Sequence, residues 1–201
     1  MCPTRPDPTA DWYDVRQAFY KRIGASVAVY TVDYELFGAP PGGGAPGAAR
    51  MALHAAFAGN RYTAAGSVND WFVEFTRSAG GQAALATGNA TLCYEALHAW
   101  ISTPAALGGG MVYRNDVRFR DDARPQLGVL SSRMLGNHVK TDKSQRKVDM
   151  MDSLRTSVAA TPGIGAWSFV YGDEYINWEQ YARTHSPARS RTRSLAHSPT
   201  D

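Results

Sequence analysis

The sequence predicts an α+β protein with a ferredoxin-like, split β-α-β fold that carries a helical insertion. The predicted elements follow the order strand, helix, insertion, strand, strand, helix, strand, which is the order of that fold. The insertion covers about residues 60–110, a stretch too helical and too long for a simple loop. With 201 residues, 44% of them hydrophobic, the chain can bury a sizeable core. We therefore expect an antiparallel sheet with one face buried under two helices.

The N-terminal part is predicted to contain a helix, a strand and a second helix. Residues 1–10 hold three prolines and are expected to form an unstructured lead-in. A helical stripe of apolar residues follows and stops at Gly24; it comprises Trp12, Val15, Phe19 and Ile23. The Val- and Tyr-rich residues 26–34 predict a strand. Residues 48–59 predict a helix that stops at Gly59.

Two helices are predicted inside the insertion. The first is expected to be capped by Ser67 or Asn69 and to end at the pair Gly80 and Gly81. The second is expected over residues 90–102. The insertion is therefore interpreted as a small helical subdomain.

Three strands are predicted in the C-terminal half of the chain. They cover residues 111–120, residues 125–139 with a bulge or kink at Gly128, and residues 166–175. The last two strands and the strand at 26–34 are expected to lie in one sheet.

A helix is predicted across this sheet, between the last two strands. Thr141 or Asp142 is expected to cap it, and Pro162-Gly163 to end it. Its buried face is expected to carry Val148, Met151, Leu154 or Arg155, and Val158. A further helix is predicted to begin at residues 176–182.

Composition excludes several classes of function. The net charge of +3 is local, because residues 186–201 carry three arginines and one aspartate, so the rest of the chain gives no indication of nucleic-acid binding. Cys2 and Cys93 form no disulfide framework and no zinc motif, and no cofactor is predicted. No apolar run reaches the ~20 residues of a membrane span, and the polar N-terminus is unlike a signal peptide.

No catalytic constellation is predicted, and the chain is not expected to be an enzyme. His138 has Asp142 and Ser131 or Ser132 nearby in the sequence. A serine triad, however, also needs an oxyanion hole, and the chain has no G-x-S-x-G nucleophile elbow. Separately, Asn89 opens an Asn-Ala-Thr triplet and is a predicted glycosylation site if the domain is luminal or extracellular.

Four motifs resemble the second large extracytoplasmic domain of Patched and Niemann–Pick type C proteins, in the resistance–nodulation–division superfamily. They are SVNDWFVEF (67–75), SSRMLGNHVKT (131–141), KVDMMDSLRTSVA (147–159) and YINWEQYA (175–182). The matches are colinear from about Asp11 to Tyr181 and cover most of the chain. The resemblance implies a ferredoxin-like porter-type domain over residues 11–182. The tail at 183–201 is expected to be disordered, because its Ser-, Pro- and Arg-rich composition offers little apolar surface.

The resemblance also implies a function. The parent would be a membrane transporter or receptor for sterols or other lipids, and its remaining membrane and extracytoplasmic parts would be partners of this domain. A motif at the junction with the next membrane helix would comprise Trp178, Glu179, Gln180 and Tyr181. Aromatic residues facing a lipid would be Trp71, Phe72 and Phe75, with plain core packing as the alternative.

The family pattern breaks at Ala182, which is followed by polar residues instead of an apolar run. A truncated gene model is the favoured interpretation, and a real soluble product is the alternative. Two other functions stay open: a free-standing module that binds a lipid or a protein through the same fold, and, less favoured, a hydrolase. For the short helix at 176–182, the alternative to a membrane connector is a C-terminal turn that docks Trp178 into the core.

Overall fold

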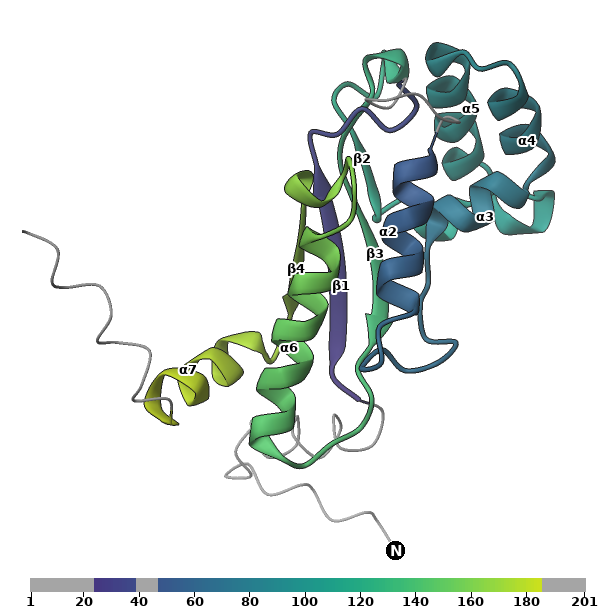
Figure 1. Ribbon diagram of the computed structural model, residues 1–201. Coiled ribbons are helices and arrows are strands. Elements are labelled where there is room, and N and C mark those ends of the chain that lie inside the picture. The colour runs from purple at the N-terminus through teal and green to yellow at the C-terminus, as the bar shows by residue number, and fades with distance from the viewer. Residues whose placement is uncertain (1–23, 39–46, 186–201) are drawn as a thin grey trace, which may run out of the picture.

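The computed structural model describes residues 24–38 and 47–185 and confirms the α+β class. Its centre is an antiparallel sheet with the strand order β2-β3-β1-β4 (Figure 1). The strands are β1 (Ser26–Val32), β2 (Val117–Phe119), β3 (Val129–Asn137) and β4 (Ser168–Gly172). With one helical connection before β2 and another before β4, this order is that of the split β-α-β sandwich.

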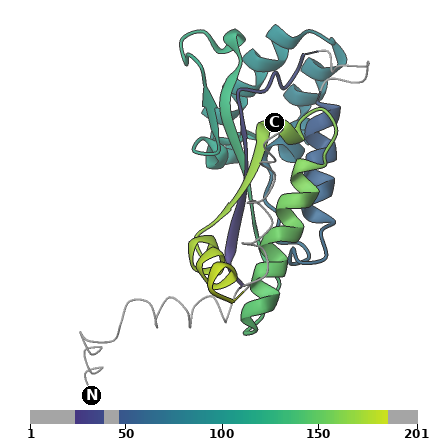
Figure 2. The ribbon, with the colours of Figure 1, turned by 60° about the vertical axis from the view of Figure 1, so that its left-hand side comes forward.

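Helices α2 (Ala48–Ala58) and α6 (Ser144–Ala159) cover one face of the sheet, as Figures 1 and 2 show. In β1, Val27 and Val29 point towards these helices and are buried, because side chains alternate along a strand. The buried face of α6 carries Val148, Met150, Met151, Leu154 and Val158. The expected apolar stripe is confirmed, with Leu154 rather than Arg155 in the core.

The boundaries of α6 differ from the prediction at both ends. The helix begins after Lys143, and neither Thr141 nor Asp142 caps it. The Lys143 N–H donates to Thr141 Oγ1 at 3.3 Å, which makes Thr141 part of the turn before the helix instead. At the other end the helix stops at Ala159, before Pro162, which cannot continue a helix.

The insertion contains α3 (Trp71–Arg77), α4 (Ala79–Ala86) and α5 (Ala90–Ser102), which pack around a second core. The prediction of a single helix ending at Gly80-Gly81 is wrong, because the extended Ser78 separates α3 from α4. The Ser78 hydroxyl caps α4 and accepts a hydrogen bond from the Gly81 N–H at 3.0 Å. Gly80 and Gly81 therefore lie inside α4. A Cβ at Gly81 would lie 1.9 Å from the Phe75 carbonyl oxygen, so only glycine fits this close turn. The cap of α3 is Asp70, not Ser67 or Asn69.

The strands are shorter than predicted. Of residues 111–120, only β2 is a strand, because residues 111–113 form a 3-10 turn. The strand expected over residues 125–139 begins only at Val129, because Pro125–Leu127 form a 3-10 turn. Gly128, with a φ of 95°, marks the start of the strand and not a bulge or kink within it. β4 likewise covers only part of residues 166–175.

The C-terminal helix α7 (Tyr175–His185) is longer than expected and includes residues 183–185, which had been assigned to a disordered tail. The predicted lead-in at 1–10, the predicted stripe before Gly24 and residues 186–201 lie outside the described residues. Within the described part, no helix is both long and apolar enough to cross a membrane.

Candidate functional site

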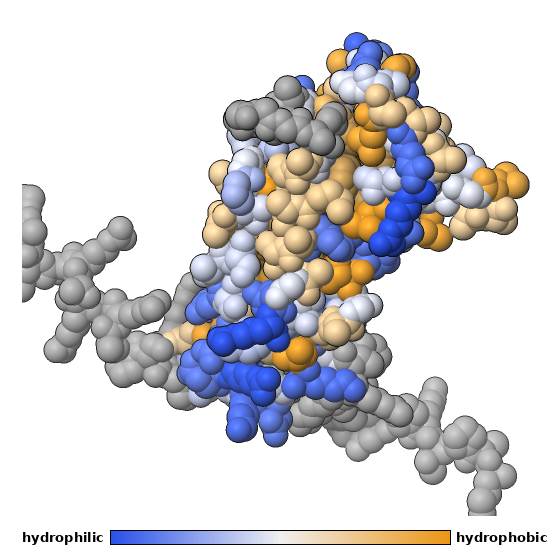
Figure 3. All heavy atoms as spheres, turned by 45° about the vertical axis from the view of Figure 1, so that its right-hand side comes forward, coloured by the Kyte–Doolittle hydropathy of each residue, from blue (hydrophilic) through white to orange (hydrophobic). Residues whose placement is uncertain are grey.

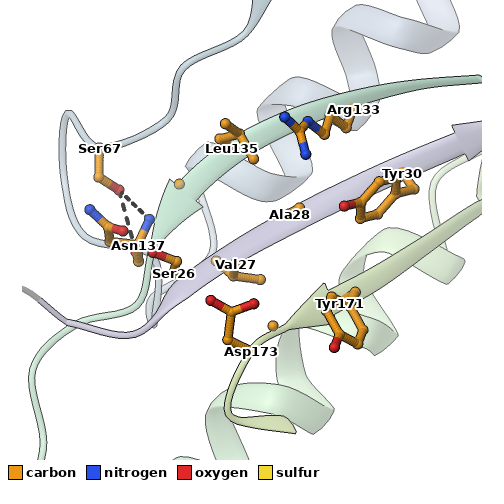
Figure 4. A pocket seen from close by; sticks show the side chains of 12 residues that line it. Ser26, Val27, Ala28, Tyr30, Ser67, Arg133, Leu135, Asn137, Tyr171 and Asp173 are labelled. Atoms are coloured by element: carbon orange, nitrogen blue, oxygen red, sulfur yellow. Dashed lines mark hydrogen bonds between the residues drawn. The ribbon is translucent and has the colours of Figure 1, made fainter. Parts of the chain in front are cut away.

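The face of the sheet opposite α2 and α6 is left uncovered by the described residues (Figures 1 and 2). It carries large aromatic side chains, and Figure 4 shows Tyr30 and Tyr171 among them. Phe169 and Tyr171 of β4 are 51% and 44% exposed, although both are large and apolar in their rings. The rings of Tyr30 and Phe169 stack with their centroids 5.2 Å apart. Exposed aromatic groups of this size, gathered on one surface, are typical of a binding surface.

A hollow of about 400 Å³ lies on this open face. The register explains it, because Ala28 of β1 lies between Leu135 of β3 and Tyr171 of β4. The small methyl group of Ala28 forms the floor, and its two large neighbours form the walls (Figure 4). The volume lies in the range of small-molecule sites, ~300–1,000 Å³.

One end of the hollow is polar. Ser26 and Asn137 face each other across β1 and β3, and Asp173 follows β4 beside them. Ser67 belongs to the segment that continues the sheet beyond β3, and its hydroxyl accepts from the Asn137 N–H at 3.0 Å. Polar groups therefore lie at one end of the hollow, and the apolar walls extend away from them.

At the other end of the hollow, Tyr30 lies directly opposite Arg133. The Arg133 Nε donates to Asp116 Oδ1 at 2.7 Å. Hydrogen bonds with Asp116 and Tyr30 raise the pKa of Arg133 above its ordinary value. The guanidinium is thus a fixed, charged border of the site and already has a carboxylate partner.

The motif predicted at a membrane junction lies at the start of α7. Trp178 is only 5% exposed and packs on His138 and Tyr175. Glu179 forms an ion pair with Arg155 at 2.7 Å. Gln180 is exposed and Tyr181 packs against the edge of the core. The docking of Trp178, given as the alternative, is what the structure shows, while a membrane continuation stays a prediction.

The three aromatic residues predicted to face a lipid do not reach the surface. Trp71, Phe72 and Phe75 are between 0% and 1% exposed in the core of the insertion. The lipid-facing interpretation is therefore wrong for these side chains, because their rings pack on one another and on Phe37. The alternative, core packing, is correct.

Asn89 lies on the surface of the insertion as the cap of α5. Its Oδ1 accepts from the N–H groups of Thr91 and Leu92, and the residue is exposed. A glycan would attach through Nδ2, which this cap does not use. Glycosylation at this site stays a prediction.

Of the residues that the structure describes, His138 hydrogen-bonds to Tyr62 and Tyr175 and not to Ser131, Ser132 or Asp142. It is fully buried, with Nδ1 3.2 Å from the Tyr62 carbonyl oxygen and Nε2 2.8 Å from the Tyr175 hydroxyl. Because the carbonyl can only accept, Nδ1 carries the hydrogen, and Nε2 accepts from Tyr175. Burial lowers the pKa of His138 to about 4.

Among the described residues, no group of His, Cys, Asp and Glu side chains could hold a metal ion.

The chain matches none of the family models with which it was compared, and no curated protein is significantly similar to it.

Proposed function

We propose that the chain is an extracytoplasmic domain of a Patched- or Niemann–Pick-like membrane protein and that it binds a sterol or a similar lipid on the open face of its sheet. Two features of the fold support this proposal. The insertion follows the first helix of the sandwich, where the SVNDWFVEF motif begins, and α7, with the YINWEQYA motif, follows the last strand.

The hollow over Ala28 is the observation from which we infer that the ligand is a sterol or a similar lipid. Its walls, Leu135 and Tyr171, are largely apolar, and polar groups border it at both ends, Asn137 at one and Arg133 at the other. The rigid apolar ring system of a sterol would lie between the walls, with its single hydroxyl at one of these polar ends. Because the ligand is rigid, little conformational entropy is lost on binding.

The experiment measures binding of a fluorescent sterol to the full chain and to two matched variants. Ala28→Leu fills the hollow, and Val32→Leu enlarges an exposed side chain at the far end of the same strand. We expect Ala28→Leu to abolish binding and Val32→Leu to leave it unchanged.

A second variant guards against a folding defect in Ala28→Leu. Tyr171→Ala removes a wall of the hollow, and the side chain is 44% exposed, so its loss costs little core packing. It should weaken sterol binding with little change in the urea unfolding midpoint. Equal sterol affinity in the unchanged chain, Ala28→Leu and Tyr171→Ala would contradict the proposed site.

A free-standing binding module is the second candidate, and the docking of Trp178 favours it. With Trp178 buried on His138 and Glu179 bound to Arg155, α7 is held to the domain by contacts of its own. Both candidates use the same hollow. They differ in whether the natural protein continues into a membrane span, which sequencing of the transcript beyond the codon of Tyr181 decides.

A further inference from the structure

Five cationic side chains lie at one end of the molecule, where the surface at the bottom of Figure 3 is strongly hydrophilic. We call them the basic end; they are Arg61, Lys140, Lys143, Arg146 and Lys147. All are exposed except Lys147, which is half-buried. They come from two segments, the turn after α2 and the start of α6, that are distant in the sequence.

Backbone pairing brings these two segments together. Thr63 and His138 form an isolated bridge, and the Val139 N–H donates to the Tyr62 carbonyl oxygen at 2.8 Å. The Arg61 guanidinium lies over the Tyr62 ring, 4.6 Å from its centroid. The turn after α2 is therefore fixed beside the start of α6.

A shallow hollow of about 590 Å³ lies between the two segments. Its lining is Arg61, Tyr62, Lys143, Gln145, Arg146 and Asp149. This is room for a group the size of a phosphate and its substituents, with cations on both sides.

The charge of the basic end is not neutralised by the described part of the chain. None of the five cations is within ion-pair distance of a carboxylate there, whereas arginines 50, 77, 120, 124, 133 and 155 are all paired. Residues 140–149 hold two carboxylates, Asp142 and Asp149. With these two and its five cations, the basic end has a local net charge of +3. The first turn of α6 carries no acidic residue, and the helix dipole adds to the positive potential.

The basic end is also the end at which α7 leaves the sheet. β1 begins there, since Ser26 pairs with Asn137, the last residue of β3. β4 ends there, since Val27 pairs with Gly172, three residues before α7 (Figure 1). If α7 leads to a membrane, as the proposed function holds, this end faces the bilayer.

We propose that the basic end binds the anionic headgroups of a phospholipid bilayer. The inference uses the proposed function only for the orientation of the domain. The chemistry is independent of it: Lys and Arg side chains that form no ion pair with a described residue attract a surface of phosphate and carboxylate groups. On a leaflet rich in anionic lipid, each contributes about a fivefold gain in binding. The bilayer surface is the favoured partner because the cations form one broad face instead of a deep pocket for a single ion.

The test is co-flotation of the full chain with vesicles of phosphatidylcholine, with and without phosphatidylserine. We expect binding only to vesicles that contain phosphatidylserine, and we expect salt to weaken it. Lys143→Gln with Arg146→Gln should weaken binding roughly 25-fold. Arg114→Gln with Arg118→Gln removes two exposed arginines, on and beside β2, that form no ion pair with a described residue, and should leave binding unchanged.

Two further experiments test whether the Arg-rich terminal segment or free phosphate accounts for the binding. Replacing Arg189, Arg191 and Arg193 with Gln tests the Arg-rich terminal segment, and should leave the effect of Lys143 and Arg146 intact. Inorganic phosphate at matched ionic strength should not displace the chain from vesicles.

Four results would overturn the proposal: no phosphatidylserine-dependent binding, equal binding of the Lys143/Arg146 variant, displacement by free phosphate, or tighter binding of a single-stranded RNA than of vesicles. Sterol binding on the open face is measured separately with Ala28→Leu, so either proposal can fail alone.

Discussion

Acidification should destabilise the domain through His138, the buried histidine that links α7 to the sheet. The neutral ring donates to the Tyr62 carbonyl and accepts from the Tyr175 hydroxyl, and a proton on Nε2 removes that acceptor. The charged ring is disfavoured because His138 is fully buried, and this loss of solvation outweighs the hydrogen bond to the Tyr62 carbonyl, which favours the charged form.

The magnitude follows from the two pKa values of His138. The folded value is about 4, and the unfolded value is about 6.5. Because the folded value is lower, the unfolded chain takes up the proton first, and stability is lost as the pH falls from about 6.5 towards 4. Between pH 7 and pH 5 the loss is about 2 kcal/mol, and the full effect is roughly 3 kcal/mol.

The assay is urea unfolding at pH 7 and pH 5, followed by tryptophan fluorescence. His138→Gln is the matched variant: it starts from a lower stability but has no imidazole to titrate. We expect the free energy of unfolding to fall by about 2 kcal/mol in the unchanged chain and much less in the variant. Equal losses in both proteins would refute the role of His138.

Three further predictions concern packing, charge and modification. Leu154→Asp should abolish cooperative unfolding, because it places a carboxylate at a fully buried position of α6; Thr156→Asp, on the exposed side of the helix, should shift the urea midpoint little. Asp70→Asn should cost about 3–5 kcal/mol, because the guanidinium of Arg50, 1% exposed and bound to both Asp70 oxygens, loses its counter-charge; a loss below 1 kcal/mol, measured by urea unfolding, would contradict a charged pair. Passage of the domain through a secretory pathway should add a glycan at Asn89 that a glycosidase removes and Asn89→Gln prevents, and an unmodified mass would contradict a luminal or extracellular domain.

The sequence predicts a helix correctly where residues next to its two ends determine where it begins and stops. The helix at residues 90–102 is correct at both ends, because Asn89 caps it and Pro104 follows its end closely. The irregularity expected at Gly128 falls at the start of β3, where the positive φ favours glycine.

Errors arose where tertiary contacts decide the local structure. Asp70 caps α3 while its carboxylate also receives two hydrogen bonds from Arg50, twenty residues earlier, a pairing that no local pattern reveals. Residues 111–120 alternate as a strand would, but only the part beside β3 finds a pairing partner. Burial of Trp71 likewise depends on the fold of the whole insertion.

The candidate site could be predicted only in part. Alternation in residues 26–32 separates Val27 and Val29 of one face from Ala28 and Tyr30 of the other. It does not tell which face the helices cover, nor that Leu135 and Tyr171 flank Ala28, because that requires the register of three strands. The basic end was missed for a similar reason: Arg61 and Lys143 are eighty-two positions apart and meet only through the bridge between Thr63 and His138.

Photolabelling tests the central claim, a sterol site on the open face of the sheet, most directly. The full chain is irradiated with a photoactivatable sterol, and the labelled residues are located by tandem mass spectrometry. We predict labels in residues 133–137 and 169–173, removed by excess unlabelled sterol and by Ala28→Leu. Labels confined to the insertion, residues 71–102, or labels that excess sterol does not remove, would contradict it.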